Sequence, residues 1–359
     1  MITSLQPRDY RARHTSTLTI DVRSPGEFAH GHIPGAVNLP LFSDDERAVV
    51  GTLYKKEGRD SAVKRGLNFV SPRLNEIIER ATQLLATSHD PSSREIVIYC
   101  ARGGMRSKSI AMLVACAGYK TYQLSGGFKA YKHFLRQEIS AYRFILLGGK
   151  TGSGKTALLP KLSACGEQVV DLEKIACHRG STFGALGYYS QPTQEQFIVS
   201  VLHEIAGHEK HRPIWLEHEG SRLGAVAIPA ELWKSMYHSP VAYIEVPLAY
   251  RKEILQQEYG KFANNELIEC TKKLEKRLGG LATAAIITAL ENNDREKAVN
   301  LLLEHYDRAY DYATKRNTHN TFFKVDLTTK AYTQWATHLS SFGHQISDEI
   351  RRSHPTQGT

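Results

Sequence analysis

The sequence predicts an α/β protein of two domains, each built around a parallel sheet. At 359 residues the chain is long for one hydrophobic core and sufficient for two. Short apolar runs alternate with helical patterns, which favours parallel strands covered by helices. Two of these runs lead through a glycine-rich loop into a helix, and the second such unit restarts the pattern. We therefore expect domains at residues 1–140 and 141–359.

The first domain shows strand and helix signals in alternation. Its predicted strands are Leu18–Val22, Ile96–Tyr99 and Tyr119–Leu124. A short helix and tight turns follow the first strand, and the turn Ser125-Gly126-Gly127 follows the last. The longer helices are predicted at residues 72–87, at Ser107–Ala117, and from the last turn to about residue 139. This order is typical of a parallel sheet.

The second domain repeats the pattern and then becomes helical. Its predicted strands are Phe144–Leu147, Gln168–Asp171, Ile214–Glu217 and Val241–Val246. Beyond about residue 249 the strand signals vanish, and four helices are predicted, at Arg251–Tyr259, Glu266–Leu278, Leu281–Asn292 and Arg295–Thr314. A final run, Phe322–Leu327, is predicted as an edge strand. We therefore expect a helical subdomain at about 249–320.

Composition points to a polyanionic partner and a reducing compartment. Lys and Arg total 46 against 37 Asp and Glu, giving a formal charge of +9, which favours nucleic acid over a membrane surface. No apolar stretch approaches the roughly twenty residues of a membrane span, and no export signal is evident. Five cysteines at unrelated spacings suggest neither a disulfide framework nor a zinc site. We expect a soluble, cytoplasmic protein without membrane contact and with one reactive thiol.

The first glycine-rich loop carries the candidate thiol. It reads Cys100-Ala101-Arg102-Gly103-Gly104-Met105-Arg106 and joins an apolar strand to a helix. A helix N-terminus and two nearby arginines favour the thiolate form, which is the nucleophile. Cys100, Arg102 and Arg106 are therefore candidate catalytic residues. The spacing Cys-x5-Arg also occurs in protein tyrosine phosphatases, so the loop alone leaves two reactions open, phosphate ester cleavage and transfer of a chalcogen atom.

The second loop is a P-loop, Gly149-Lys150-Thr151-Gly152-Ser153-Gly154-Lys155-Thr156. The backbone of Gly149, Gly152, Ser153 and Gly154 can wrap phosphate oxygens, while Lys155 reaches a terminal phosphate and Thr156 can bind Mg²⁺. A P-loop recognises phosphates rather than bases, so any diphosphate fits it. A carboxylate partner for Mg²⁺ is expected at the end of a neighbouring strand, at Asp171 or Glu217.

Two polar segments behind the P-loop add candidate substrate or Mg²⁺ contacts, because α/β domains keep their sites in loops after strands. The first segment supplies His178, Arg179 and Ser181. The second begins at Trp215 and supplies Glu217, Glu219, Ser221 and Arg222.

The first domain resembles the rhodanese family over residues 15–136. The resemblance rests on Asp21-Val22-Arg23, Glu27-Phe28, the run from Gly31 to Pro40, and Gly126-Gly127-Phe128, together with the cysteine loop. Tyr99 stands where the phosphatase pattern has a histidine. The resemblance implies a rhodanese-like parallel-sheet fold, and it favours chalcogen transfer over phosphate ester cleavage.

The whole chain resembles the tRNA 2-selenouridine synthase family. The resemblance rests on the rhodanese-like domain, the P-loop, His178-Arg179-Gly180-Ser181, and Trp215-x-Glu217-x-Glu219-x-Ser221-Arg222, with Gly220 and Leu223 departing from the pattern. It implies a P-loop NTPase-like second domain. It also implies conversion of 2-thiouridine to 2-selenouridine at the wobble position of tRNAs for lysine, glutamate and glutamine. Geranyl diphosphate would give an S-geranyl intermediate, and selenophosphate would supply selenium, carried on Cys100 as a selanyl group.

The resemblance also implies partners: the tRNA and an enzyme that supplies selenophosphate. Basic residues predicted to contact the tRNA backbone are Lys55, Lys56, Lys64, Arg65, Lys129, Lys132, Arg136, Lys272, Lys273, Lys276 and Arg277. Two alternatives remain open on the residues. One is an ATP-dependent tRNA sulfurtransferase or kinase fused to a persulfide carrier. The other is a regulatory or RNA-binding protein whose two loops are inert.

Overall fold

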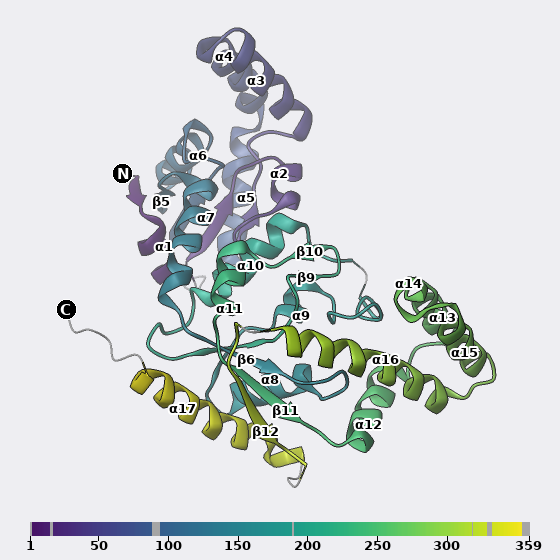
Figure 1. Cartoon of the computed structure of the whole chain (residues 1–359). Coiled ribbons are helices and arrows are strands. Elements are labelled where there is room, and N and C mark those ends of the chain that lie inside the picture. The colour runs from purple at the N-terminus through teal and green to yellow at the C-terminus, as the bar shows by residue number, and fades with distance from the viewer. Residues whose placement is uncertain are drawn as a thin grey trace. The chain divides into compact units, whose positions relative to one another are not determined.

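Each half of the chain folds around its own five-stranded sheet (Figure 1). The structure is a computed structural model that describes residues 2–14, 17–87, 94–188, 190–317, 319–328 and 332–353. One compact unit comprises Met1–Glu138 with Ile198–Gly207, and the other comprises Ile139–Phe197 with His208–Thr359. Each unit is described by itself below.

The sheet of the first unit is parallel throughout, in the order β1-β5-β4-β2-β3. Its strands are β1 (Thr3–Leu5), β2 (Leu18–Asp21), β3 (Val37–Asn38), β4 (Glu95–Tyr99) and β5 (Lys120–Leu124). Ile96, Val97, Ile98 and Tyr99 on β4 are fully buried, as expected for a central strand covered on both faces. The predicted parallel sheet is thus confirmed, with the loop of Cys100 at the carboxyl end of β4.

Helices of the first unit largely match the prediction, with α1 and a pair of helices, α3 and α4, as additions. They are α1 (Pro7–Arg13), α2 (Pro25–His30), α3 (Asp44–Lys56), α4 (Arg59–Val70), α5 (Leu74–Ala86), α6 (Met105–Cys116) and α7 (Gly127–Glu138), with a 3₁₀ turn at Ser71–Arg73. Neither α1 nor the pair α3 and α4 was predicted from the sequence; α3 and α4 lie side by side as a helical hairpin (Figure 1). No residue of α3 is buried, so this hairpin lacks the strong apolar periodicity of a core helix.

The sheet of the second unit is also parallel, in the order β12-β11-β6-β8-β7. Its strands are β6 (Phe144–Gly148), β7 (Gln168–Val169), β8 (Ile214–Glu217), β11 (Val241–Glu245) and β12 (Phe322–Asp326). The predicted edge strand is confirmed, because β12 lies at the end of the strand order and, among the described residues, pairs with β11 alone. A separate antiparallel pair, β9 (Arg222–Leu223) and β10 (Val226–Ala227), follows β8. The P-loop leaves the carboxyl end of the central strand β6.

Helices dominate the second unit after β11, as predicted. The helices of this half of the chain are α8 (Lys155–Ala164), α9 (Leu172–Ala176), α10 (Gln194–Ile205), α11 (Ala230–Met236), α12 (Leu248–Tyr259), α13 (Asn264–Lys273), α14 (Glu275–Leu278), α15 (Gly280–Glu291), α16 (Arg295–Arg316) and α17 (Trp335–Ser353), with 3₁₀ turns at Ile139–Ala141 and Tyr332–Gln334. Most of α10, from Ile198 onward, belongs to the first unit. The predicted helix Glu266–Leu278 is two helices, with a break at Leu274.

The helical part has a core of its own. Phe183, Leu267, Ile286, Leu290 and Ala298 are buried together there. In Figure 1, α13, α14 and α15 group beside one end of α16. No helix in the described ranges is both long enough and apolar enough to cross a bilayer.

Candidate functional site

The Cys100 side chain lies at the end of β4 and is 3% exposed. The hydroxyl of Ser107, in the first turn of α6, lies 3.2 Å from the Cys100 Sγ and 3.1 Å from the carbonyl oxygen of Gly104. Gln123 Nε2 donates to the same hydroxyl at 2.9 Å. Ser107 is therefore a polar partner of the thiol that the sequence analysis missed, because only its position in the folded helix turns it toward Cys100.

A glycine turn holds the cysteine loop in place. The N–H groups of Phe128 and Lys129 donate to the carbonyls of Cys100 (2.9 Å) and Ala101 (3.0 Å). Gly127 has a φ of +59°, and a Cβ atom there would lie 2.1 Å from the carbonyl oxygen of Cys100. Only glycine fits such a contact, which explains the Gly-Gly-Phe of the predicted motif.

Replacing Gly127 by alanine is expected to displace the cysteine loop and destabilise the first unit by about 3 kcal/mol or more. The positive φ costs about 1–2 kcal/mol, and the overlap with the Cys100 carbonyl adds to it. Gly118→Ala is the matched control, since Gly118 has a φ of +90° and nothing within 4 Å of an added Cβ. Urea unfolding of both variants measures the difference; equal losses would show that the close approach does not constrain the loop.

The two arginines of the cysteine loop differ in their surroundings. Arg102 is exposed, whereas Arg106 is half-buried. Arg106 Nη1 lies 2.6 Å from Glu27 Oε2, and Arg47 Nε lies 3.6 Å from the same oxygen. Burial opposes ionisation of Glu27, but Arg106 outweighs it, so the pKa of Glu27 lies below its ordinary value. Arg106 is therefore fixed beside the loop by a carboxylate, a partner that the sequence did not predict.

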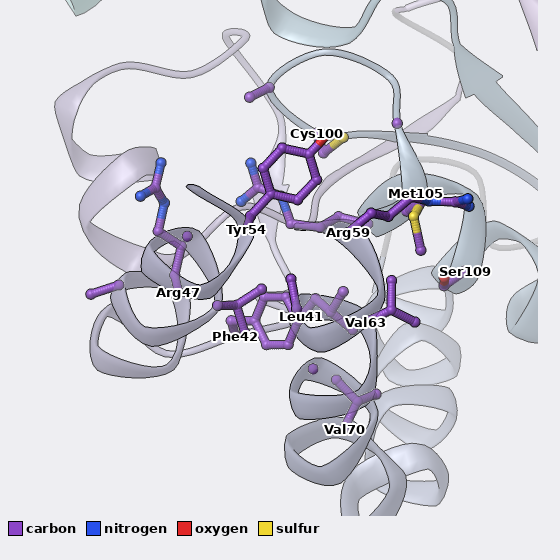
Figure 2. A pocket seen from close by; sticks show the side chains of 18 of the residues that line it. Leu41, Phe42, Arg47, Tyr54, Arg59, Val63, Val70, Cys100, Met105 and Ser109 are labelled. Atoms are coloured by element: carbon purple, nitrogen blue, oxygen red, sulfur yellow. The ribbon is translucent and has the colours of Figure 1, made fainter. Parts of the chain in front are cut away.

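A wide groove opens beside Cys100 (Figure 2). Its volume is about 1010 Å³, and its walls come from the α3–α4 hairpin, the segment before it and the cysteine loop. Figure 2 shows Leu41, Phe42 and Val63 grouped together, with Arg47 and Arg59 to either side of Tyr54. The groove thus combines apolar walls with cationic side chains next to the thiol. The sequence analysis did not predict it, because the hairpin that builds it was not predicted.

The P-loop joins β6 to α8 and is held from two other helices. Gly152 and Gly154 have φ values of +77° and +78°, which glycine adopts without strain. Lys155 Nζ donates to the carbonyl of Gly149 at 2.9 Å, and the N–H of Gly149 donates to Tyr310 Oη at 3.1 Å. Arg251, itself paired with Asp307 at 2.6 Å, donates to the carbonyl of Thr151 at 2.9 Å. Residues of α12 and α16 therefore brace the loop.

A cavity of about 470 Å³ lies over the P-loop. Among the predicted site residues, the structure brings together there Gly149, Gly152, Ser153, Gly154, Lys155, Thr156, Arg179, Ser181 and Glu219. Residues that the prediction missed also line it, namely Glu173, His218, Glu258 and Tyr310.

Other predicted residues lie outside this cavity. Asp171 caps α9, accepting from the N–H of Lys174 at 2.7 Å. Glu217 is fully buried and accepts from the N–H of Leu172 at 3.0 Å. His178 is buried against Gly184 and Gly224. Ser221 and Arg222 are exposed at the β9 turn, where Arg222 donates to the carbonyl of Ala225 at 2.8 Å.

Glu173, rather than Asp171 or Glu217, is the carboxylate that meets the P-loop. Thr156 Oγ1 donates to Glu173 Oε2 at 2.7 Å. In the described part of the chain, no group of three or more His, Cys, Asp or Glu residues is arranged to hold a metal ion. Mg²⁺ commonly takes one or two protein oxygens and completes its shell with phosphate oxygens and water. The pair Thr156 and Glu173 fits that pattern, so a Mg²⁺ site there remains a prediction.

Burial shapes the charges around the P-loop. Burial raises the pKa of Glu219 to about 7, with Lys155 opposing the shift and Glu173 adding to it. Burial also raises the pKa values of Glu173 and Glu217, although Thr156 and Lys155 oppose the shift at Glu173. The pKa of His218 falls to about 4, mainly through burial and secondarily through the charge of Lys155. A cation bound in this cavity would favour the ionised carboxylates.

Glu219 is expected to make the stability of the second unit depend on pH. Between its ordinary pKa of 4.5 and about 7, the folded state binds more protons at this site than the unfolded state. The free energy of unfolding therefore falls as pH rises through that window, by up to roughly 1.4 kcal/mol per pH unit. Glu219→Gln should reduce this slope, and Glu173 and Glu217, whose pKa values are also raised, keep part of it. All three tryptophans lie in the second unit, so their fluorescence during urea unfolding reports it; parallel profiles of wild type and variant would contradict the prediction.

Fold and site together define a rhodanese-like unit carrying a cysteine loop, joined to an α/β unit that carries a P-loop. The profile of the rhodanese-like domain matches residues 7–134, as the resemblance implied. The profile described as the tRNA 2-selenouridine synthase AAA domain matches residues 142–342, more than half of the chain. The chain belongs to the tRNA 2-selenouridine synthase family.

Relatives with that name align over most of the chain. The tRNA 2-selenouridine synthase of Sulfurovum sp. is 34% identical over 343 residues, covering 86% of this chain and 92% of its own. Those of Shewanella denitrificans and Hahella chejuensis are 33% and 31% identical, covering 86% and 92% of this chain and 91% and 93% of their own. Among solved structures, a rhodanese-related protein from Thermoplasma volcanium is 17% identical and covers 37% of this chain and 92% of its own, with a TM-score of 0.22.

Proposed function

We propose that this protein is a transferase that converts 2-thiouridine into 2-selenouridine at the wobble position of tRNAs for lysine, glutamate and glutamine. The observation that carries the proposal is the presence of two anion-binding loops, each with its own reactive group, in separate units. One loop offers the buried thiol of Cys100 and the other offers the ammonium of Lys155. Membership of the family supports the same activity.

The first step alkylates the thiouridine sulfur. Sulfur attacks C1 of geranyl diphosphate, the C1–O bond breaks, and pyrophosphate leaves with the bonding electrons. The P-loop amides and Lys155 bind the diphosphate and stabilise the charge that it gains as it leaves. A magnesium ion held by Thr156 and Glu173 would neutralise part of that charge. The step turns a poor leaving group, a thiolate on the ring, into a geranyl thiol that leaves readily.

The second step exchanges sulfur for selenium. Selenophosphate carries selenium at the selenide level, so a selanyl group on Cys100 would need a two-electron oxidant that the reaction does not supply. In a balanced step, the Cys100 thiolate attacks C2, the C2–S bond breaks, and geranyl thiol leaves with a proton. The selenium of selenophosphate then attacks C2 and displaces the Cys100 thiolate; water attacks phosphorus, the P–Se bond breaks, and phosphate leaves. Arg102 and the backbone amides of the cysteine loop would bind the phosphate oxygens of selenophosphate. A partner enzyme that makes selenophosphate would supply this substrate.

The groove beside Cys100 suits an alkylated nucleoside within RNA. Its apolar walls, which include Leu41, Phe42 and Val63, can cover a geranyl chain, while Arg47 and Arg59 can pair with backbone phosphates. Lys55, Lys56, Lys64 and Arg65 of the same hairpin are exposed and add positive charge. These features support tRNA as the partner, with the positive net charge acting in the same direction.

The test is mass analysis of nucleosides from 2-thiouridine tRNA incubated with the protein, geranyl diphosphate, selenophosphate and Mg²⁺. The proposal predicts loss of 2-thiouridine and appearance of 2-selenouridine without any nucleoside triphosphate. If thiouridine is unchanged, and tRNA instead stimulates ATP hydrolysis, the protein is an ATP-dependent tRNA sulfurtransferase or kinase fused to a persulfide carrier. If neither reaction occurs while tRNA binds, it is an RNA-binding protein with inert loops.

A further inference from the structure

A second, apolar cavity adjoins the cavity over the P-loop. Its volume is about 280 Å³, and it lies in the helical part of the second unit. Five residues line both cavities, Thr151, Ser181, Leu255, Tyr259 and Tyr306, so the two spaces adjoin beside Thr151 of the P-loop. A molecule with its phosphates on the P-loop would enter the second cavity past these shared side chains.

The walls of this second cavity are mostly aliphatic and aromatic, with Gln256 and the hydroxyls of Thr151, Ser181, Tyr259 and Tyr306 as their uncharged polar groups. Beyond the shared residues they include Phe183, Leu267, Leu290, Val299, Leu302 and Leu303. The one charged wall residue, Arg295, already donates to the carbonyls of Gly260 (2.6 Å) and Phe262 (2.9 Å) and to Asn264 Oδ1 (2.8 Å). A purine base needs hydrogen-bonding groups placed around its edge, whereas a hydrocarbon chain needs only apolar contact. The walls favour the hydrocarbon.

We propose that this apolar cavity binds the hydrocarbon chain of the prenyl diphosphate whose diphosphate occupies the P-loop, and that its size selects a short chain. The inference rests on the proposed function, which supplies the prenyl donor. A volume of about 280 Å³ lies just below the roughly 300–1,000 Å³ typical of small-molecule pockets, which favours a chain of about ten carbons over longer ones. Leu302 and Leu303 on α16 are two of the lining residues and offer a way to change that volume.

The test measures binding of pyrophosphate, geranyl diphosphate and farnesyl diphosphate to the full chain by calorimetry. Wild type should bind geranyl diphosphate roughly a hundredfold more tightly than pyrophosphate, because the buried chain adds hydrophobic free energy. Leu302→Trp fills the cavity and should remove most of that preference while leaving the pyrophosphate affinity unchanged. Leu303→Ala enlarges the cavity and should shift the ratio of farnesyl to geranyl affinity about tenfold toward farnesyl.

Leu301→Ala is the matched control. Leu301 neighbours these residues on α16 and packs on the core of the helical part, but it does not line the cavity. The farnesyl to geranyl ratio should therefore stay at the wild-type value. Retained pyrophosphate affinity in each variant shows that the P-loop remains folded.

Three binding results, with ADP measured as a fourth ligand, would overturn the inference. These are equal wild-type affinities for pyrophosphate and geranyl diphosphate, a Leu302→Trp variant that weakens both ligands equally, and ADP binding that is tighter than geranyl diphosphate binding and is lost in Leu302→Trp. The last result would assign the cavity to a nucleotide base. Failure of the proposed function looks different: the binding preferences would hold, yet no S-geranyl-2-thiouridine would form. Conversely, geranylation with no effect of the cavity variants on chain length would leave the function standing and remove this cavity as its site.

Discussion

A Cys100→Ser variant should lose 2-selenouridine formation by at least about a thousandfold while still making S-geranyl-2-thiouridine at the wild-type rate. Cys100 is 3% exposed, and serine nearly matches its size, so the fold should persist. A serine hydroxyl is almost fully protonated at neutral pH and is a far weaker nucleophile than a thiolate, so the residue that acts covalently is lost. The measurement is the rate of each nucleoside product, with tRNA bearing 2-thiouridine as the substrate.

Cys116→Ser is the matched control for that variant. Cys116 is exposed and lies at the C-terminal end of α6, the helix that follows the cysteine loop. It should retain both activities. Without selenophosphate, the wild type incubated with geranylated tRNA should form a covalent link between the tRNA and a peptide that contains Cys100, which denaturing electrophoresis and mass analysis detect. A selenium or phosphoryl adduct on Cys100 after incubation with selenophosphate alone would mean that the thiolate attacks selenophosphate instead, and full selenation by Cys100→Ser would exclude any covalent role.

Lys155→Ala should have the opposite effect. The rate of geranylation should fall by roughly a hundredfold or more, whereas the rate of selenation of previously geranylated tRNA should not change. Lys155 is the P-loop cation in this cavity, which Arg179 also lines, and it can offset charge on a departing pyrophosphate. Loss of one such group commonly costs about 10²–10³ in rate. Pyrophosphate binding should weaken in parallel, which calorimetry can measure.

Lys161→Ala, at the other end of α8, is the control for removal of a lysine from that helix. It should geranylate normally. If Lys155→Ala geranylated normally and failed only in selenation, the roles assigned to the two loops would be reversed. Together, the Cys100 and Lys155 variants ask whether the two units perform separable steps.

Local sequence signals predicted most of the fold, because strands and loops of this kind are encoded locally. The runs before Cys100 and before Gly149 are buried central strands, β4 and β6, and each loop opens a helix as predicted. The polar hairpin α3–α4 escaped prediction because it buries few side chains. Its groove therefore also escaped, although it has the largest volume among the cavities described here.

Sequence reasoning predicted the site residues that lie within each loop, but not the residues that other elements bring to it. Contacts between elements distant in sequence, such as Glu27 with Arg106 and Gly149 with Tyr310, depend on the folded sheet order and leave no local pattern. Glu173 is an example of a site residue that the prediction missed by two positions, since the predicted carboxylate was Asp171. The helical turn of α9 directs Asp171 to its own backbone and Glu173 to Thr156. Choosing between neighbouring carboxylates required the structure.

The central claim is that selenation proceeds through a geranylated intermediate, and a pulse and chase on one tRNA tests it most directly. The tRNA is first incubated with the protein, Mg²⁺ and geranyl diphosphate, freed of excess donor, and then given selenophosphate. The account predicts that S-geranyl-2-thiouridine accumulates in the first stage and converts to 2-selenouridine in the second, without ATP. Formation of 2-selenouridine from 2-thiouridine tRNA that has never met geranyl diphosphate would contradict it.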